Sequence, residues 1–255
     1  MCTVLFIPQK DSVIFTSLRD ENPERPATAG PALLSGENWS FIAPLDRRAG
    51  GTWAGINNYG NVVILLNGAF ENHRKETAYK KSRGLIVTAL LKSVYPVVEW
   101  SLMDMQGVEP YTLVVWSEQN LFQLVWDGEN KHRTHFDTGS ARIWSSATLY
   151  SPAAKNYRQE LFENWMNTQP GISRESIFSF FSSVTDPENG FIINRGARLK
   201  TLSYSFIELG PGQQGLLSYQ DLRSGNRQTK VLPLEHFIPD LNNLYFPSTP
   251  PDHAG

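Results

Sequence analysis

The sequence predicts an α+β protein in which helices pack on layers of β-sheet. Short apolar or alternating runs bounded by Gly, Asn and Pro recur along most of the chain, as is typical of strands. Three longer segments carry apolar residues at helical spacing and fall between the strands. The 255 residues contain no internal repeat and no break in composition. We therefore expect a single domain over residues 1–246 and a disordered, proline-rich tail over 247–255.

The chain opens with a predicted β-hairpin. Two apolar runs, 2–7 and 12–17, are separated by the turn-forming residues 8–11. If a two-residue turn closes the hairpin, facing residue numbers add up to 19, so that Cys2 lies opposite Ser17. Arg19 then follows two residues further on the same face and can reach back over Cys2. A change of one residue in the turn would move Arg19 to the other face.

The remaining strands and helices follow from their patterns. A second hairpin is predicted around the turn Asn57–Gly60, since Asn and Gly supply turn conformations. The predicted strands after the first hairpin are 52–56, 61–66, 112–116, 120–126, 142–145, 200–209, 215–221 and 227–231. The predicted helices are 82–93, 151–167, which starts at the N-cap Ser151 with Pro152 behind it, and 173–183. Their apolar stripes are Leu85, Ala89, Leu90 and Val94; Ala154, Tyr157, Leu161 and Trp165; and Ile177, Phe180 and Phe181.

Composition excludes several classes of partner. Lys and Arg number 23 against 25 Asp and Glu, for a net charge of −2, and the basic residues form no long run. We therefore expect no nucleic acid and no anionic membrane as partner. No segment approaches the roughly 18 apolar residues of a membrane helix, so we expect no stable membrane insertion. The single cysteine excludes an intramolecular disulfide and fits a reducing, cytoplasmic location. The oligomeric state stays open.

That single cysteine, Cys2, stands directly after Met1. Methionine is usually removed before a small residue, which would leave a thiol and a free α-amine on the same residue. The amine has a reference pKa of about 7.7–8.0 and the thiol of about 8.5, so the amine can accept the proton that the thiol loses. Cys2 is thus a candidate nucleophile that carries its own base. The alternative is a small apolar residue of the first strand.

Four segments in the first third of the chain resemble one family in order and spacing. They are Cys2, residues 18–21 with Arg25 and Pro26, residues 50–56, and residues 82–84. This pattern is similar to the Asn-Arg-Asp-Glu motif family, also called the transport and Golgi organisation protein 2-like family, although Leu18 replaces the first Asn of its motif. The resemblance extends to the N-terminal nucleophile hydrolases and implies a four-layer αββα sandwich of two antiparallel sheets. We interpret the glycine pair at 50–51 as structural, because it permits close packing.

The resemblance also implies a set of site residues. In such hydrolases an N-terminal cysteine attacks a linear carboxamide, and Cys2, Arg19, Asp20 and Asn67 occupy the matching positions. Arg19 would favour the thiolate, Asp20 would orient the α-amine, and Asn67 would donate to the oxyanion. The main-chain N–H of residue 68 is expected as a second oxyanion donor.

Glu21 and Ser146 are further candidate neighbours of the site. Ser146 and Leu202 stand where the hydrolases have an asparagine and an arginine, which weakens the case for hydrolysis. The individual residues also have plainer interpretations: an Arg-Asp pair can be a salt bridge, and Asn-Gly can be a turn.

Two functions are compatible with these features. The first is amide hydrolysis through a Cys2 acyl-enzyme, with a small-molecule amide as substrate and no cofactor. The second is a non-enzymatic carrier of haem or of a lipid or acyl ligand, whose apolar part would lie against Trp and Phe side chains. The chain has no haem-attachment motif, and His132 and His135 fall in a segment that we expect to be an exposed polar loop. The other three histidines are His73, His236 and His253.

Overall fold

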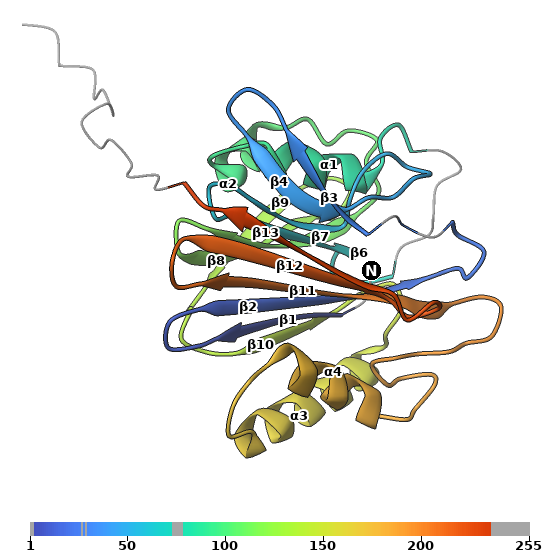
Figure 1. Ribbon diagram of the computed structural model, residues 1–255. Helices are drawn as coiled ribbons and strands as arrows, with labels where there is room; N and C mark the ends of the chain where they lie inside the picture. The colour runs from blue at the N-terminus through green and yellow to red at the C-terminus, as the bar shows by residue number, and fades with distance from the viewer. Residues whose placement is uncertain (1–2, 27, 29, 73–78, 236–255) are drawn as a thin grey trace, which may run out of the picture.

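The computed structural model describes residues 3–26, 28, 30–72 and 79–235, and it forms two antiparallel sheets between two layers of helices (Figure 1). The first sheet consists, in spatial order, of β10 (Arg142–Ser145), β1 (Thr3–Pro8), β2 (Val13–Glu21), β11 (Lys200–Gly210), β12 (Gln214–Asp221) and β13 (Arg227–Pro233). The second consists of β3 (Pro31–Ser35), β4 (Ser40–Pro44), β5 (Ala54–Asn57), β6 (Val62–Asn67), β7 (Tyr111–Ser117), β8 (Asn120–Trp126) and β9 (Lys131–Phe136). The predicted α+β sandwich is confirmed.

Helices cover the outer faces of both sheets. α1 (Arg83–Leu91) and α2 (Pro96–Leu102) pack on the second sheet, and α3 (Pro152–Thr168) and α4 (Arg174–Ser183) lie below the first sheet in Figure 1. Within the described residues, no helix is long and apolar enough to cross a membrane. The tail 247–255, His73, His236 and His253 lie outside the described residues.

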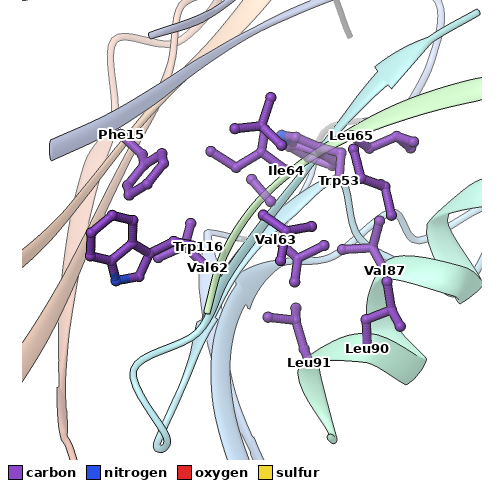
Figure 2. Close-up of a cluster of buried hydrophobic side chains, with 14 of the residues drawn as sticks. Phe15, Trp53, Val62, Val63, Ile64, Leu65, Val87, Leu90, Leu91 and Trp116 are labelled. Atoms are coloured by element: carbon purple, nitrogen blue, oxygen red, sulfur yellow. The ribbon is translucent and has the colours of Figure 1, made fainter. Parts of the chain in front are cut away.

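Strand alternation divides the core between the two faces of each sheet. Phe6 and Phe15 of the first sheet point toward the second, with ring centroids 5.8 and 6.2 Å from that of Trp116. Figure 2 shows Phe15 and Trp116 on the opposite side of the second sheet from Val87 and Leu90 of α1. The intervening residues of β1, such as Leu5, point instead toward α3 and α4.

The turn of the first hairpin is longer than predicted. β1 and β2 are joined by residues 9–12, and the N–H of Gln9 donates to the carbonyl of Ser12 at 2.8 Å. Facing residues add up to 21, with Thr3 opposite Leu18, so the predicted sum of 19 is wrong. Because the difference is two residues, the faces of the strands are kept. Arg19 therefore follows directly after the partner of Thr3.

Two of the three helical stripes differ from the prediction. α3 buries Ala154, Arg158 and Phe162, whereas Tyr157 is 42% exposed. Ala154 is buried as predicted, and Leu161 and Trp165 pack against the core, so the prediction is wrong only at Tyr157; the buried residue beside it is Arg158, which apolar spacing cannot reveal. In α1 the buried residues are Ile86, Val87, Leu90 and Leu91, and Leu85 is 37% exposed. The stripe of α4 and the Ser151 N-cap of α3, which accepts from the N–H of Ala154, are confirmed.

Four elements are absent from the sequence prediction. They are β3, β4, α2 and β9. The segment with His132 and His135 is not a loop, because β9 pairs with β8 at the edge of the second sheet. An edge strand with largely exposed side chains carries polar residues, which hides the alternation expected of a strand.

Candidate functional site

The end of β2 carries two of the predicted site residues on opposite faces. Neighbouring residues of a strand point to opposite sides of the sheet. Arg19 accordingly faces the second sheet, where it lies over the ring of Trp53, and Asp20 faces the helix layer, where it meets Tyr150. The plain interpretation of the two residues as a salt-bridged pair is not what the structure contains, because Arg19 forms its ion pairs with Glu21 and Asp46.

Arg19 is buried among these partners. The residue is 6% exposed, and its guanidinium lies 3.5 Å from a carboxylate oxygen of both Glu21 and Asp46 and 4.6 Å from the Trp53 ring centroid. Burial lowers the pKa of Arg19, an effect that the two carboxylates oppose. An arginine keeps its charge even so. Arg19 therefore provides a fixed positive charge on the inner face of β2.

Asp46 organises the loop that faces Arg19, and sequence reasoning missed it. One carboxylate oxygen accepts a hydrogen bond from Arg25 at 2.7 Å, and the other accepts from the N–H groups of Arg48 and Ala49. Burial favours the neutral form, but the hydrogen bonds from Ala49 and Arg25 outweigh it and lower the pKa of Asp46. The carboxylate is thus held ionised beside Arg19.

Asp20 is held by two hydroxyl groups. It is 2% exposed, and its oxygens accept from the hydroxyls of Tyr150 at 2.8 Å and Thr201 at 2.6 Å. Neither partner was predicted, since they lie 130 and 181 residues away in the sequence. Two donors fix the plane of the carboxylate. Asp20 is therefore oriented by neutral groups on the helix-facing side of the sheet.

Asn67, the last residue of β6, lines a cavity of about 110 Å³ together with Arg19, Trp53 and Arg83. Within the described part of the chain, no hydrogen bond engages its side-chain amide. The N–H of Gly68, in contrast, donates to the carbonyl of Pro110 at 3.1 Å. The expectation that residue 68 supplies a second oxyanion donor is therefore wrong, because its N–H already has an acceptor.

Ser146 joins the two sheets at this end of the molecule. Its residue is 1% exposed, and its hydroxyl donates to the carbonyl of Asn67 at 2.8 Å. The preceding residue, Ser145, pairs with Thr3 in the ladder of β10 and β1. Ser146 thus connects the start of β1 to the end of β6 and holds the backbone of Asn67. Leu202, which stands where the hydrolases have an arginine, is a buried apolar residue.

The glycine pair at residues 50–51 has the structural role that the sequence predicts. A Cβ on Gly51 would collide with the backbone of Gly84, and the N–H of Thr52 donates to the Gly84 carbonyl at 3.2 Å. The two motif segments therefore cross with their backbones in contact. This crossing places the Trp53 ring under the Arg19 guanidinium. It also brings Arg83 to the cavity that Asn67, Arg19 and Trp53 line.

Two further cavities lie near Ser146 and Tyr150. One, of about 320 Å³, reaches Ser146 and Trp144, and the other, of about 450 Å³, reaches Tyr150. Phe70, Ala147 and Lys155 line both. The two cavities are therefore neighbours that share one wall.

The structure brings Arg19, Asp20, Asn67, Glu21 and Ser146 to the same end of the two sheets. Cys2 lies outside the described residues. The next residue, Thr3, begins β1 and pairs with Leu18 on one side and with Ser145 on the other. These two partners directly precede Arg19 and Ser146. In the part of the chain that the structure describes, no group of three or more His, Cys, Asp or Glu side chains is arranged to hold a metal ion.

This arrangement of sheets and helices is the fold of the N-terminal nucleophile hydrolases. A variant of conjugated bile acid hydrolase from Clostridium perfringens is similar over 91% of this chain and 92% of its own, with a TM-score of 0.50 and 12% identity. The Caenorhabditis elegans ortholog of N-acylethanolamine-hydrolyzing acid amidase is similar over 91% of this chain and 100% of its own, with a TM-score of 0.55 and 13% identity. At these identities the likeness concerns the fold.

The family model described as Transport and Golgi organisation 2 matches residues 1–217. The chain therefore belongs to the Transport and Golgi organisation 2 family, as its motifs predict. A search of curated protein sequences returned no match.

Proposed function

We propose that the protein is an amidohydrolase that cleaves linear carboxamides with Cys2 as nucleophile, once removal of Met1 frees the α-amine. The observation that carries this proposal is the convergence of Arg19, Asp20 and Asn67 around the start of β1, which immediately follows Cys2. The three side chains come from two strands in different sheets, and each has the chemistry that the reaction needs.

In the proposed reaction, the α-amine takes the thiol proton and the sulfur forms a bond to the amide carbon. The Asn67 amide donates to the oxygen that becomes negative, a contact worth about 3–4 kcal/mol in other enzymes. Collapse of this intermediate breaks the C–N bond, and the leaving amine takes the proton from the α-amine. Water then adds to the thioester, which releases a carboxylate and restores the thiol. Arg19 stabilises the thiolate, and Asp20 orients the α-amine.

The test begins with the intact mass of protein purified from its native host. Loss of Met1 is required, because a peptide bond would otherwise occupy the α-amine of Cys2. The protein is then incubated with a panel of N-acyl amides, and amine release and a thioester adduct are followed by mass spectrometry. Activity should disappear in Cys2→Ala and fall strongly in Asn67→Ala. Retention of Met1, or the absence of any adduct on wild-type protein, counts against hydrolysis.

The two neighbouring cavities favour binding of an acyl ligand as a second candidate function. Leu66, Ile143, Trp144 and Phe70 provide apolar walls, and Lys155 provides a cation whose pKa burial lowers. We expect a carboxylate on an alkyl chain to bind here, which can be measured by quenching of tryptophan fluorescence with dodecanoate. Lys155→Glu should weaken dodecanoate binding, whereas dodecanol should bind equally weakly to both proteins. Equal binding of dodecanoate to both proteins would exclude this site.

Haem is supported less well as the ligand of such a carrier. Among the described residues, His132 and His135 lie on β9 and pair with Asp127 and Asn120. No described His, Cys or Met side chain lines the three cavities at this end of the sheets. The described lining therefore offers no His, Cys or Met as axial ligand for the iron, and the hydroxyl of Tyr150, the tyrosine in this lining, already donates to Asp20. A titration with hemin should give only a non-saturating change in absorbance, and a saturable Soret shift would contradict this conclusion.

A further inference from the structure

Arg158 is a fully buried charged residue behind the start of β1. It lies in the middle of α3, is 0% exposed and is the largest fully buried side chain among the described residues. A buried charge is costly unless it is paired or fully hydrogen-bonded. Arg158 makes no ion pair within the described residues: neutral groups hold its guanidinium, and the Asp186 carboxylate acts on its charge only through space.

These neutral groups hold the guanidinium firmly. Its Nε–H donates to the carbonyl of Asn189 at 3.0 Å, and one terminal nitrogen donates to the carbonyl of Gly190. The other terminal nitrogen donates to the hydroxyls of Thr3 at 2.8 Å and Ser145 at 3.3 Å. Arg158 therefore clamps β1 and β10 at the pair Thr3–Ser145, directly after Cys2 in the sequence.

The same guanidinium also stacks on Tyr150. Its central carbon lies 3.6 Å from the centroid of the Tyr150 ring, and the hydroxyl of that ring donates to Asp20 at 2.8 Å. A cation close to the ring face fixes the ring and makes its hydroxyl a better donor. Arg158 thus reaches the site by two routes, through Thr3 and through Tyr150 to Asp20.

We propose that Arg158 is a positioning residue that holds the start of β1 and the Tyr150–Asp20 pair together and thereby sets the reactivity of the Cys2 thiol. Its positive charge, which no carboxylate contacts among the described residues, favours a thiolate and disfavours a protonated α-amine at the residue that precedes Thr3. Both effects promote transfer of the thiol proton to the amine. This inference rests on Cys2 being the nucleophile of the proposed function, but its test requires no turnover.

Other charged groups around Asp20 and Arg158 have partners of their own. Arg19 lies on the opposite face of β2 with two carboxylates. Arg195 lies 5.5 Å from the Tyr150 ring centroid and pairs with Glu188 at 3.2 Å. Asp186 accepts from the backbone of the loop after α4, and its pKa is lowered first by the hydrogen bond from the N–H of Asn189 and also by the positive charge of Arg158. Arg195 is therefore a suitable control, since it is a second cation at the same ring that has no contact with Thr3.

The test measures alkylation of Cys2, the only cysteine of the chain, by iodoacetamide as a function of pH. Arg158→Met should slow alkylation at pH 7 about tenfold, which corresponds to a rise of one unit in the pH midpoint. Arg158→Lys, which keeps the charge, should restore the midpoint, and Arg195→Met should not change it. Circular dichroism and thermal melting identify variants that remain folded.

An unchanged midpoint in folded Arg158→Met would overturn the proposal, even if the variant melts at a lower temperature. If that variant does not fold, Tyr150→Phe decides, because it keeps the stacked ring and removes only the hydroxyl bound to Asp20. Slower alkylation of Tyr150→Phe supports the proposal, and the wild-type rate contradicts it. Alkylation can also be followed on protein that retains Met1, so failure of amide hydrolysis and failure of this inference give different results.

Discussion

Replacement of Thr201 by valine tests the Asp20 network most directly. The Thr201 hydroxyl donates to Asp20 at 2.6 Å and accepts from the N–H of Ile193 at 2.9 Å. Valine has nearly the same shape but makes neither bond. A hydrogen bond to a charged group contributes about 1.5–3 kcal/mol, and an unsatisfied buried N–H costs about 1–3 kcal/mol. We therefore expect Thr201→Val to lose about 3–5 kcal/mol of unfolding free energy.

Urea unfolding followed by tryptophan fluorescence measures this loss. A chain of this size shifts its melting temperature by roughly 2–4 °C per kcal/mol, so thermal melting should show a decrease of about 10 °C. Thr201→Ser is the matched control, because it keeps the hydroxyl and removes one methyl group at a cost of about 1 kcal/mol. The reasoning is refuted if Thr201→Val melts within about 3 °C of the wild type, or if Thr201→Ser is destabilised as much as Thr201→Val.

Two further predictions concern the motif loops. Gly51→Ala should destabilise the protein by about 1–3 kcal/mol because the new Cβ meets the Gly84 backbone. The control Gly171→Ala adds a Cβ in open space and should change the unfolding free energy by no more than about 0.5 kcal/mol. Equal melting temperatures of the two variants would contradict the backbone crossing. Asp46→Asn should cost about 1–3 kcal/mol at pH 7, since it weakens the charged hydrogen bond from Arg25. Because the folded-state pKa of Asp46 is lowered, its stabilisation is fully present above the unfolded value of about 3.9 and is lost as the pH falls through the folded pKa. Urea unfolding at pH 7 and at pH 3 should therefore show a smaller difference between wild type and Asp46→Asn at pH 3, and a constant difference would contradict this assignment.

The sequence predicted which residues meet at this end of the two sheets but not the groups that hold them. Motif resemblance identified Arg19, Asp20 and Asn67, and the predicted hairpin placed Arg19 near the chain start despite the wrong turn length. The partners of Asp20 depend on distant pairing that no local pattern contains. In particular, the register of β2 and β11 shifts between Thr201 and Ser203. This irregularity puts Thr201 opposite Asp20, and a bulge of this kind cannot be located from alternation alone.

Arg158 was missed for a different physical reason. Helical stripes are recognised by apolar residues, but in α3 the position between Ala154 and Phe162 is occupied by a buried cation. Its contacts are backbone carbonyls, hydroxyls and aromatic rings from three other parts of the chain. The prediction therefore assigned Tyr157 to the inner face and left Arg158 outside.

The two buried arginines differ in what surrounds them, and this difference determines the field at the start of β1. Arg19 has the carboxylates of Glu21 and Asp46 at 3.5 Å, which weaken its positive field without removing it. Among the described residues, hydroxyls, carbonyls and rings contact Arg158, and the Asp186 carboxylate acts on it only through space. Electrostatic interactions are strong where water is excluded. Both arginines should therefore contribute to the positive potential beside Thr3, Arg19 from the inner face of the first sheet and Arg158 from its helix-facing side, although the motif that marks this family on β2 contains only Arg19.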